Sequence, residues 1–428
     1  MKAKAAANAH FVGWGGDCAG TDVCAVAAGQ GGTLTATFER PHVSALDSVG
    51  GGPGDEAIAL LAADAGGAFF LAPLAAKELG GGPADFGAGV VAGHGATDVV
   101  VGRRTVEGKT AWTVAIGGLL YDDGIGISGD GAGGVIAGAI IGASTANVGS
   151  LAVSAIDGVG NVLLARLDAD GKPIWAKFLA QASDGGTHLH GNGLGNVVVT
   201  SRVPSPMTLH GMEIKADYAM MVKADGAVAW VRALPPLQVA TVDVGPQGWT
   251  ALAYRRTDSP QVELVVIDGL GQDIWTFATK AFPGPSFVAL GADGSLVAIG
   301  MVGGAADFAP TLAGMPTWAR FSASGALLGV AALATAPRTL TAMTQVGAAI
   351  AGGGVCYVGA DNASVIALGP DGALLWKLST PQVDAIAATP GGPLWFGGGV
   401  QGTAKVGGLH LSVPANHHRD AWLARVMP

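Results

Sequence analysis

A hairpin that carries tryptophan recurs along the chain, and this repeat constrains the fold more than any other feature. Each copy has an apolar strand, a short turn built on Asp and Gly, and a second strand that opens on Trp. The clear copies span residues 162–180, 219–234, 263–279 and 364–380, and weaker ones span 99–116 and 317–333. The repeated position holds Trp112, Trp175, Trp230, Trp275 and Trp376, and Gly329 takes it in the sixth copy.

The turn of each copy has residues suited to joining two antiparallel strands. In Ala169–Asp170–Gly171 and Ala224–Asp225–Gly226 we expect Asp to accept hydrogen bonds from its own backbone and Gly to adopt a positive φ. The Trp follows at a fixed offset, so its large ring is expected to fill the same gap in every copy.

A second, Trp-free hairpin lies between the Trp hairpins, at 130–140, 191–202, 288–302 and 385–399. Two hairpins make a four-stranded sheet, and a period of roughly 45–60 residues is typical of a propeller blade. The sequence therefore predicts an all-β protein, a β-propeller of seven four-stranded blades. The predicted units are 43–110, 111–173, 174–227, 228–273, 274–326, 327–373 and 374–428.

The two ends of the predicted propeller are expected to pair. The last unit stops before its Trp strand, and the stretch after Glu39 supplies a strand that can replace it. We expect residues 42–48 to lie beside 420–426, which closes the ring and leaves no open edge. The predicted domains are thus a short β segment at 1–41 and the propeller at 42–428.

Composition agrees with a sheet-rich body and excludes some partners. Charged residues make up 13% of the chain, the glycines number 71, and the net charge is −9. The basic residues form no cluster, and the pairs Arg103–Arg104 and Arg255–Arg256 are expected to be solvated, so we do not expect nucleic acid as a partner. The uncharged stretch 131–156 predicts two short strands joined by residues 142–149, with no membrane span.

The Trp hairpins resemble the repeats of bacterial PQQ-like and SBBP-type seven-bladed β-propellers. Quinoprotein dehydrogenases share this hairpin, but the resemblance implies that their cofactor site also needs a vicinal cysteine pair and calcium ligands. Neither is matched here, since Cys356 is the only cysteine of the predicted propeller. We therefore expect no cofactor.

Residues 11–39 resemble the second half of a divergent internalin-type B-repeat, a small bacterial surface repeat. Cys18 and Cys24 stand where that family forms a disulfide, and the resemblance implies the same bond here, which in turn implies an oxidising compartment. Zinc is the alternative, but these cysteines have no partner pair nearby. The family's first half and an export signal are absent, so we expect a piece of a longer exported protein, extracellular or at the cell surface.

Residues with chemical potential are few. His188 and His190 share one strand face because they are two residues apart, and they are the candidates for a ligand-binding face. A zinc site would need a third ligand, which His410, His417 and His418 do not supply from the sequence alone. The segments 123–134 and 167–173 have partial calcium-loop spacing without the closing acid, and they recur wherever a turn is needed. We therefore expect no metal and no catalytic residue.

The function expected from these features is that of a non-catalytic binding or scaffolding module, with a protein or carbohydrate ligand at a propeller face. One alternative is an extracellular lyase or hydrolase with its site on the propeller axis, and another is a quinoprotein-like oxidoreductase. An enzyme predicts carboxylates or histidines with shifted pKa values near the central channel, whereas a scaffold predicts an axis lined by small and apolar residues.

Overall fold

The computed structural model describes most of the chain, and structure is discussed for those residues only. They are residues 10–16, 34–39, 42–49, 57–75, 82–155, 161–182, 186–259, 261–279, 285–301, 310–312, 315–332, 348–350, 356–360, 364–369, 374–388, 393–400, 402–407, 409–412 and 420–427.

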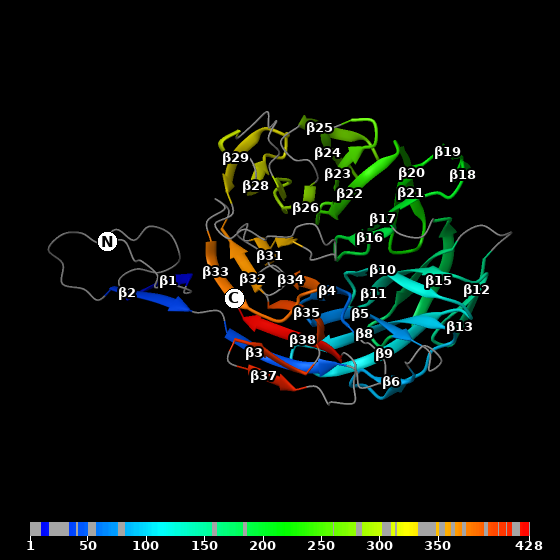
Figure 1. Cartoon of the computed structure of the whole chain (residues 1–428), viewed down its shortest axis with the longest axis horizontal. Helices are drawn as coiled ribbons and strands as arrows, with labels where there is room; N and C mark the ends of the chain where they lie inside the picture. The colour runs from blue at the N-terminus through cyan, green and yellow to red at the C-terminus, as the bar shows by residue number, and fades with distance from the viewer. Residues whose placement is uncertain are drawn as a thin grey trace.

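The predicted all-β propeller fold is confirmed. Within the described ranges, six antiparallel sheets have four strands each (Figure 1). From the inner edge outward, they are β10 (Asp122–Gly129), β11 (Val135–Ile141), β14 (Val162–Leu167) and β15 (Pro173–Ala180); β16 (His188–Gly191), β17 (Val197–Arg202), β20 (Asp217–Val222) and β21 (Val228–Leu234); β22 (Leu237–Val244), β23 (Thr250–Arg256), β24 (Val262–Ile267) and β25 (Asp273–Thr279); β26 (Pro285–Leu290), β27 (Leu296–Met301), β28 (Pro316–Phe321) and β29 (Leu327–Ala332); β30 (Ala348–Ile350), β31 (Cys356–Ala360), β32 (Ser364–Leu368) and β33 (Leu374–Ser379); and β34 (Ala385–Ala388), β35 (Leu394–Val400), β38 (Asp420–Met427) and β3 (His42–Val49).

One further sheet has six strands where the sequence predicted four. Its strands are β4 (Leu60–Asp64), β5 (Gly67–Ala75), β8 (Thr97–Thr105), β9 (Thr110–Gly117), β12 (Thr145–Val148) and β13 (Leu151–Ser154). A strand was predicted after residue 149, where β13 lies, but β12 falls in the connection predicted at 142–149. It forms because residues 145–148 pair with the outer edge of β9, with Asn147 opposite Gly117 and Val148 opposite Ile116.

The innermost strands of these sheets contact one another in a closed circle. Strand β4 contacts β10, and the contacts continue through β16, β22, β26, β30 and β34 back to β4. The predicted pairing of the two ends is present: β3 runs antiparallel to β38, with His42 opposite Met427 and Val49 opposite Ala421. A sheet built from both ends of the chain therefore closes the circle.

The predicted unit boundaries are displaced by one strand. From 111–173 onward, each predicted unit opens on the strand that holds the repeated Trp or Gly329, whereas in the structure that strand is the fourth strand of the preceding sheet. Trp112, Trp175, Trp230, Trp275 and Trp376 lie in β9, β15, β21, β25 and β33, and Gly329 lies in β29. The hairpins themselves were predicted in the right places, because strand spacing does not depend on where a unit is cut.

The turns explain part of the repeat pattern. Gly171 and Gly226 have φ values of 79° and 77°, as expected. Asp225 accepts the N–H of Ala227, but in the first turn the capping carboxylate belongs to Asp168, which accepts N–H bonds at 2.9 and 2.8 Å from the residues two and four positions later. The prediction that Asp170 holds that turn was therefore wrong.

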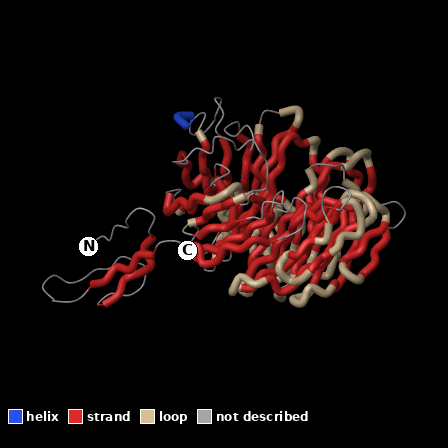
Figure 2. The backbone as a smooth tube through the Cα atoms, turned by 60° about the horizontal axis from the view of Figure 1, so that its bottom comes forward, coloured by secondary structure: helices blue, strands red, loops and turns tan. Residues whose placement is uncertain are grey.

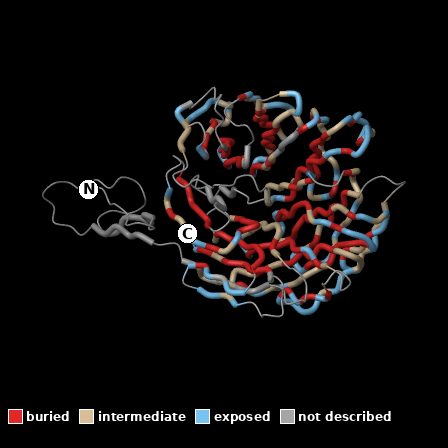
Figure 3. The backbone as a smooth tube through the Cα atoms, in the orientation of Figure 1, coloured by how far each residue is buried: buried red, intermediate tan, exposed pale blue. Residues whose placement is uncertain are grey.

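Buried residues, red in Figure 3, follow the strands of the ring, and apolar side chains of neighbouring sheets pack together in clusters. In the largest of these clusters, Phe69 and Val101 of the six-stranded sheet pack with Val135 and Leu163 of the next sheet. Because both faces are covered inside each sheet, strands such as β11, β14 and β20 are nearly continuous buried runs, whereas the outer strands β15 and β25 have exposed residues between more buried ones.

One predicted surface pair is not solvated. Arg104 is 5% exposed and donates from Nη1 to Thr110 Oγ1 at 2.9 Å, and Arg103 pairs with Asp64 at 3.2 Å. Both arginines lie on β8, in the middle of the six-stranded sheet, and these bonds offset part of the cost of burying their charges.

Short elements lie outside the large sheets (Figure 2). They are the two-stranded pairs β1 (His10–Gly16) with β2 (Leu34–Glu39), β6 (Ala84–Asp85) with β7 (Val90–Val91), β18 (Met207–Leu209) with β19 (Met212–Ile214) and β36 (Thr403–Val406) with β37 (Leu409–Ser412), and the 3-10 helix η2 (Pro310–Leu312). Figures 1 and 2 show β1 and β2 beside the ring rather than within it. Cys18 and Cys24 fall outside the described residues.

No helix in the described part of the chain is long and apolar enough to cross a membrane.

Candidate functional site: the axial cavity

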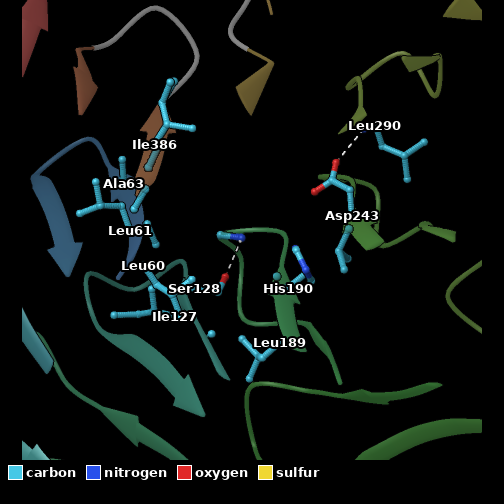
Figure 4. Close-up of a pocket in the computed structure, with 18 of the residues that line it drawn as sticks. Leu60, Leu61, Ala63, Ile127, Ser128, Leu189, His190, Asp243, Leu290 and Ile386 are labelled. Atoms are coloured by element: carbon cyan, nitrogen blue, oxygen red, sulfur yellow. Dashed lines mark hydrogen bonds between the residues drawn. The ribbon is translucent and has the colours of Figure 1, made fainter. Parts of the chain in front are cut away.

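A cavity of about 270 Å³ lies inside the circle of innermost strands (Figure 4). Six of these strands line it. Their lining residues are Leu60–Ala63 of β4, Gly126–Ser128 of β10, Leu189–Gly191 of β16, Asp243 and Val244 of β22, Leu290 of β26 and Ala385–Ala388 of β34. The cavity is therefore built by residues far apart in the sequence, which only closure of the ring brings together.

Small residues let the inner strands approach one another. A Cβ on Gly126 would lie 2.1 Å from the carbonyl oxygen of Leu189, so only glycine fits where β10 passes β16. Such close approach is the usual reason for glycine in a strand interior.

The cavity has two chemically different sides, as Figure 4 shows. Leu60, Ile127 and Ile386 lie on one side and present only apolar groups. His190 and Asp243 lie on the other, on the neighbouring strands β16 and β22. A ligand in the cavity thus meets apolar side chains on one side, next to the hydroxyl of Ser128, and the side chains of His190 and Asp243 on the other.

His190 is a neutral imidazole in this site. Burial, and next the nearby His188, lower the pKa of His190 to about 3. Burial also lowers the pKa of His188, which lies two residues earlier on β16 and is not part of the cavity lining. Of the two histidines singled out from the sequence, the structure places His190 in the cavity.

Asp243 is the one acidic side chain among the described lining residues. Its Oδ2 accepts the N–H of Leu290 at 2.7 Å, which joins β22 to β26. Burial raises the pKa of Asp243 to about 6, and the backbone bonds from Leu290 and Val244 oppose part of that rise.

Asp243 was not among the residues predicted from the sequence. The signal was present: in TVDV the acid stands inside an apolar innermost strand, before the turn that begins at Gly245, rather than in the turn itself. An Asp in that place costs desolvation, so it calls for an explanation that a turn Asp does not.

Ser128 shows no sign of an activated nucleophile. Its hydroxyl accepts the N–H of Gly193 at 3.2 Å and donates to the carbonyl of Gly129 at 3.2 Å. These bonds hold β10 against the turn after β16, and none connects Ser128 to His190.

The oxygen-rich loops are turns in the structure. Asp130 and Asp168 each use one carboxylate oxygen to accept two backbone N–H bonds within their own loops, 123–134 and 167–173. Across the residues described, no three His, Cys, Asp or Glu side chains come together as a metal site.

Comparisons with known proteins identify no family for this chain. The crystal structure of puromycin hydrolase is similar over 85% of this chain and 55% of that chain, at 15% identity and a TM-score of 0.49. The structure of the Dos1 propeller is similar over 89% of this chain and 94% of that chain, at 9% identity and a TM-score of 0.43. This chain thus spans about half the length of puromycin hydrolase.

No family model matches the chain. No curated protein matches it either. We draw no functional argument from the two structural similarities.

Proposed function

We propose that the protein is a non-catalytic binding module, a seven-bladed propeller whose ligand enters the axial cavity. The six-stranded sheet is the seventh blade, since its β4 stands in the circle of innermost strands between β34 and β10. The repeat resemblance supports assigning the blades to the PQQ-like or SBBP type.

The observation that carries the proposal is the cavity itself. A space of about 270 Å³, lined mainly by apolar residue types together with the polar side chains of Ser128, His190 and Asp243, is the usual form of a small-ligand site. Six strands support it, so its shape is held by the whole ring rather than by one loop.

The side chains that line this cavity favour binding over catalysis. An enzyme needs a nucleophile or a general base aligned with a partner, whereas the hydroxyl of Ser128 is bonded to backbone groups. Leu, Ile, Ala and Gly make up most of the remaining lining, as a binding module predicts.

The second candidate is a lyase or hydrolase, and one observation favours it. His190 and Asp243 share one side of the cavity, and both have pKa values shifted by burial. Shifted groups in a cavity are typical of active sites. An Asp with a pKa of about 6 is also suited to general-base work near neutral pH.

For the setting of the protein, we propose an extracellular or cell-surface location and a longer exported precursor. The support is the resemblance of residues 11–39 to half of a bacterial surface repeat, together with the disulfide that it implies between Cys18 and Cys24. The ligand then belongs to the proteins or carbohydrates found outside the cell, and assembly with other surface proteins is part of the same proposal.

The test uses arrays of glycans and secreted proteins, probed with the full chain and with Ala63→Phe, which fills part of the cavity. A matched control is Ala111→Phe, because Ala111 is exposed on the outer strand β9. We expect Ala63→Phe to lose the binding that the unaltered chain and the control both show.

Binding that Ala63→Phe does not change would overturn the proposal, as would the absence of any binding. Mass spectrometry of each captured ligand separates the two candidates. A ligand recovered intact supports a binding module, whereas a cleaved ligand supports the hydrolase or lyase.

A further inference from the structure

We infer that the axial cavity selects ligands that carry a primary ammonium group on an apolar stem. The inference rests on the proposed binding function of this cavity and adds the chemical class of the ligand.

The first support is the state of Asp243 in the cavity wall. A carboxylate offers about four acceptor positions, and the backbone amides of Leu290 and Val244 use two of them. The described lining contains no Lys or Arg that would neutralise the charge. An ionised Asp243 is therefore a partly buried anion that lacks a counter-ion, and a bound cation would supply one.

The second support is the opposite side of the cavity. Leu60, Ile127 and Ile386 offer only apolar contact, which suits a hydrocarbon stem and not a second charge. A linear ligand lying across the cavity would place its stem against these residues and its charged end at Asp243. The neutral imidazole of His190 beside Asp243 adds one hydrogen-bonding group without a repelling charge.

The third support is the weaker binding expected of ligands that lack an ammonium group. A carboxylate or phosphate ligand would meet the charge of Asp243 in a partly desolvated space, where like charges repel strongly. A neutral ligand would fill the cavity but leave Asp243 without a counter-ion. Selectivity for ammonium over both follows from one residue.

The pH dependence of binding follows from the same residue. Because Asp243 has a pKa of about 6, it loses its proton as the pH rises through that value, and ammonium binding should strengthen there. His190 faces Asp243 from β16 and stays neutral over this range, because burial lowers its pKa to about 3. Burial also lowers the pKa of His188, two residues earlier on the same strand. The described residues of β26 and β34 in the lining carry no titratable side chain.

The experiment compares four probes by calorimetry at pH 7.5, using the full chain. Hexylamine is the ammonium probe, 1-hexanol its neutral counterpart and hexanoate its anionic counterpart. Nα-acetyl-lysine-N-methylamide presents the same ammonium as a protein side chain would. We expect hexylamine to bind about tenfold tighter than 1-hexanol, as one charge-assisted hydrogen bond provides, and hexanoate to bind weakest.

The matched variant is Asp243→Asn, which keeps an oxygen to accept the N–H of Leu290 and so preserves the joint between β22 and β26. It should bind hexylamine and 1-hexanol equally, with 1-hexanol binding unchanged, and its thermal unfolding should match that of the unaltered chain. In the unaltered chain the preference for hexylamine should fall as the pH is lowered from 7.5 to 5.

Equal or weaker binding of hexylamine relative to 1-hexanol would overturn the inference and leave the cavity's binding role in place. If none of the four probes binds and Ala63→Phe also changes nothing on the arrays, the proposed function fails with it. Binding of the lysine derivative as tight as that of hexylamine would support the inference with a protein side chain as the source, and binding of hexylamine alone would support it with a free amine.

Discussion

The indole ring of Trp112 packs directly against the α-carbon of Gly171, which lies in the turn of the neighbouring sheet. A Cβ at residue 171 would lie 2.7 Å from Trp112 Cδ2, and Trp112 Nε1 donates to the carbonyl of Ala169 in that turn at 2.8 Å. The ring contact recurs between Trp230 and Gly271, although Trp230 Nε1 has no hydrogen-bond partner in the described structure. The repeated Gly and the repeated Trp are thus two halves of one contact between neighbouring blades.

The first prediction tests this contact with Gly171→Ala. The substitution places a Cβ against the indole and forces alanine into a φ of 79°. We expect the free energy of unfolding in urea to fall by about 2–4 kcal/mol, from backbone strain and overpacking together.

Gly211→Ala is the control, since Gly211 has a φ of 82° but a Cβ at this position would have nothing within 4 Å. Gly211→Ala should lower the free energy of unfolding only through backbone strain, by about 1–2 kcal/mol. Equal losses in the two variants would show that the indole contact contributes nothing.

The second prediction concerns the bond between Asp130 and Arg166. Asp130 Oδ2 pairs with Arg166 at 2.8 Å, while Oδ1 accepts the N–H groups of Ala132 and Gly134. Asp130→Ala removes all of these bonds and leaves a half-buried guanidinium, so we expect a loss of about 3–5 kcal/mol in urea unfolding.

Asp168→Ala provides the comparison within the same sheet. Asp168 makes the same two turn bonds, to Asp170 and Lys172, and it is only partly buried. Asp168→Ala should lower the free energy of unfolding by about 1 kcal/mol. If Asp130→Ala costs no more than Asp168→Ala, the ion pair with Arg166 adds no stability.

The sequence predicted the hairpins well and the interior chemistry poorly, for a physical reason. Strand and turn signals are local: glycine adopts a positive φ without steric cost and Asp-Gly pairs are typical of tight turns, so the place of Gly171 in a turn was predictable. The partner of a buried acid comes from another blade, and no local pattern shows it. Asp243 was not predicted as a site residue because its neighbours Leu290 and His190 are remote in sequence.

The errors at Asp170 and at β12 have a similar origin. Two acids stand in LDADG, and only the strand geometry puts the first of them within reach of the amides of the turn. Strand β12 exists because β9 has a free outer edge for it, which is a fact about the sheet and not about residues 145–148.

The carboxyl groups of Asp98 and Asp122 both lie close to Gly117. A Cβ at residue 117 would lie 1.7 Å from Asp98 Oδ1 and 2.8 Å from Asp122 Oδ2. Asp98 is 1% exposed, and its Oδ1 has no hydrogen-bond partner in the described structure. Burial raises the pKa of both carboxyls, and the charge of Asp98 adds to the rise at Asp122, while the nearby His94 opposes it.

The third prediction follows from the sign of these shifts. Below a pH of about 3.8, the ordinary pKa of Asp, both the folded and the unfolded states hold the proton and the pair costs nothing. As the pH rises through the raised pKa values of the folded state, the folded protein must give up protons that it binds more tightly, so its stability falls. Asp98→Asn removes the part of this cost that Asp98 causes, because asparagine has no charge to bury and no longer raises the pKa of Asp122.

We therefore expect Asp98→Asn to be more stable than the unaltered chain at pH 8, with the difference shrinking toward pH 4. Urea unfolding at one-unit pH steps measures it, with Asp168→Asn as a control for loss of a carboxylate in a turn. Parallel pH profiles for Asp98→Asn and the unaltered chain would contradict the prediction.

The last prediction tests ring closure by two deletions that differ in eight residues. Removing residues 1–41 leaves β3 in place, whereas removing residues 1–49 also takes away His42–Val49. Without β3, the outer edge of β38 offers unpaired N–H and C=O groups to other chains. We expect the shorter deletion to unfold near the temperature of the full chain and to elute as a monomer on size exclusion.

The longer deletion should melt at least about 10 °C lower and should elute as aggregates, because it loses a strand and gains an exposed edge at once. Adding a peptide of residues 40–51 to it should restore the monomer by occupying the same edge, since His42 and Val49 pair with the two ends of β38. If the longer deletion remains monomeric and melts with the shorter one, the pairing of β3 with β38 does not hold the ring closed.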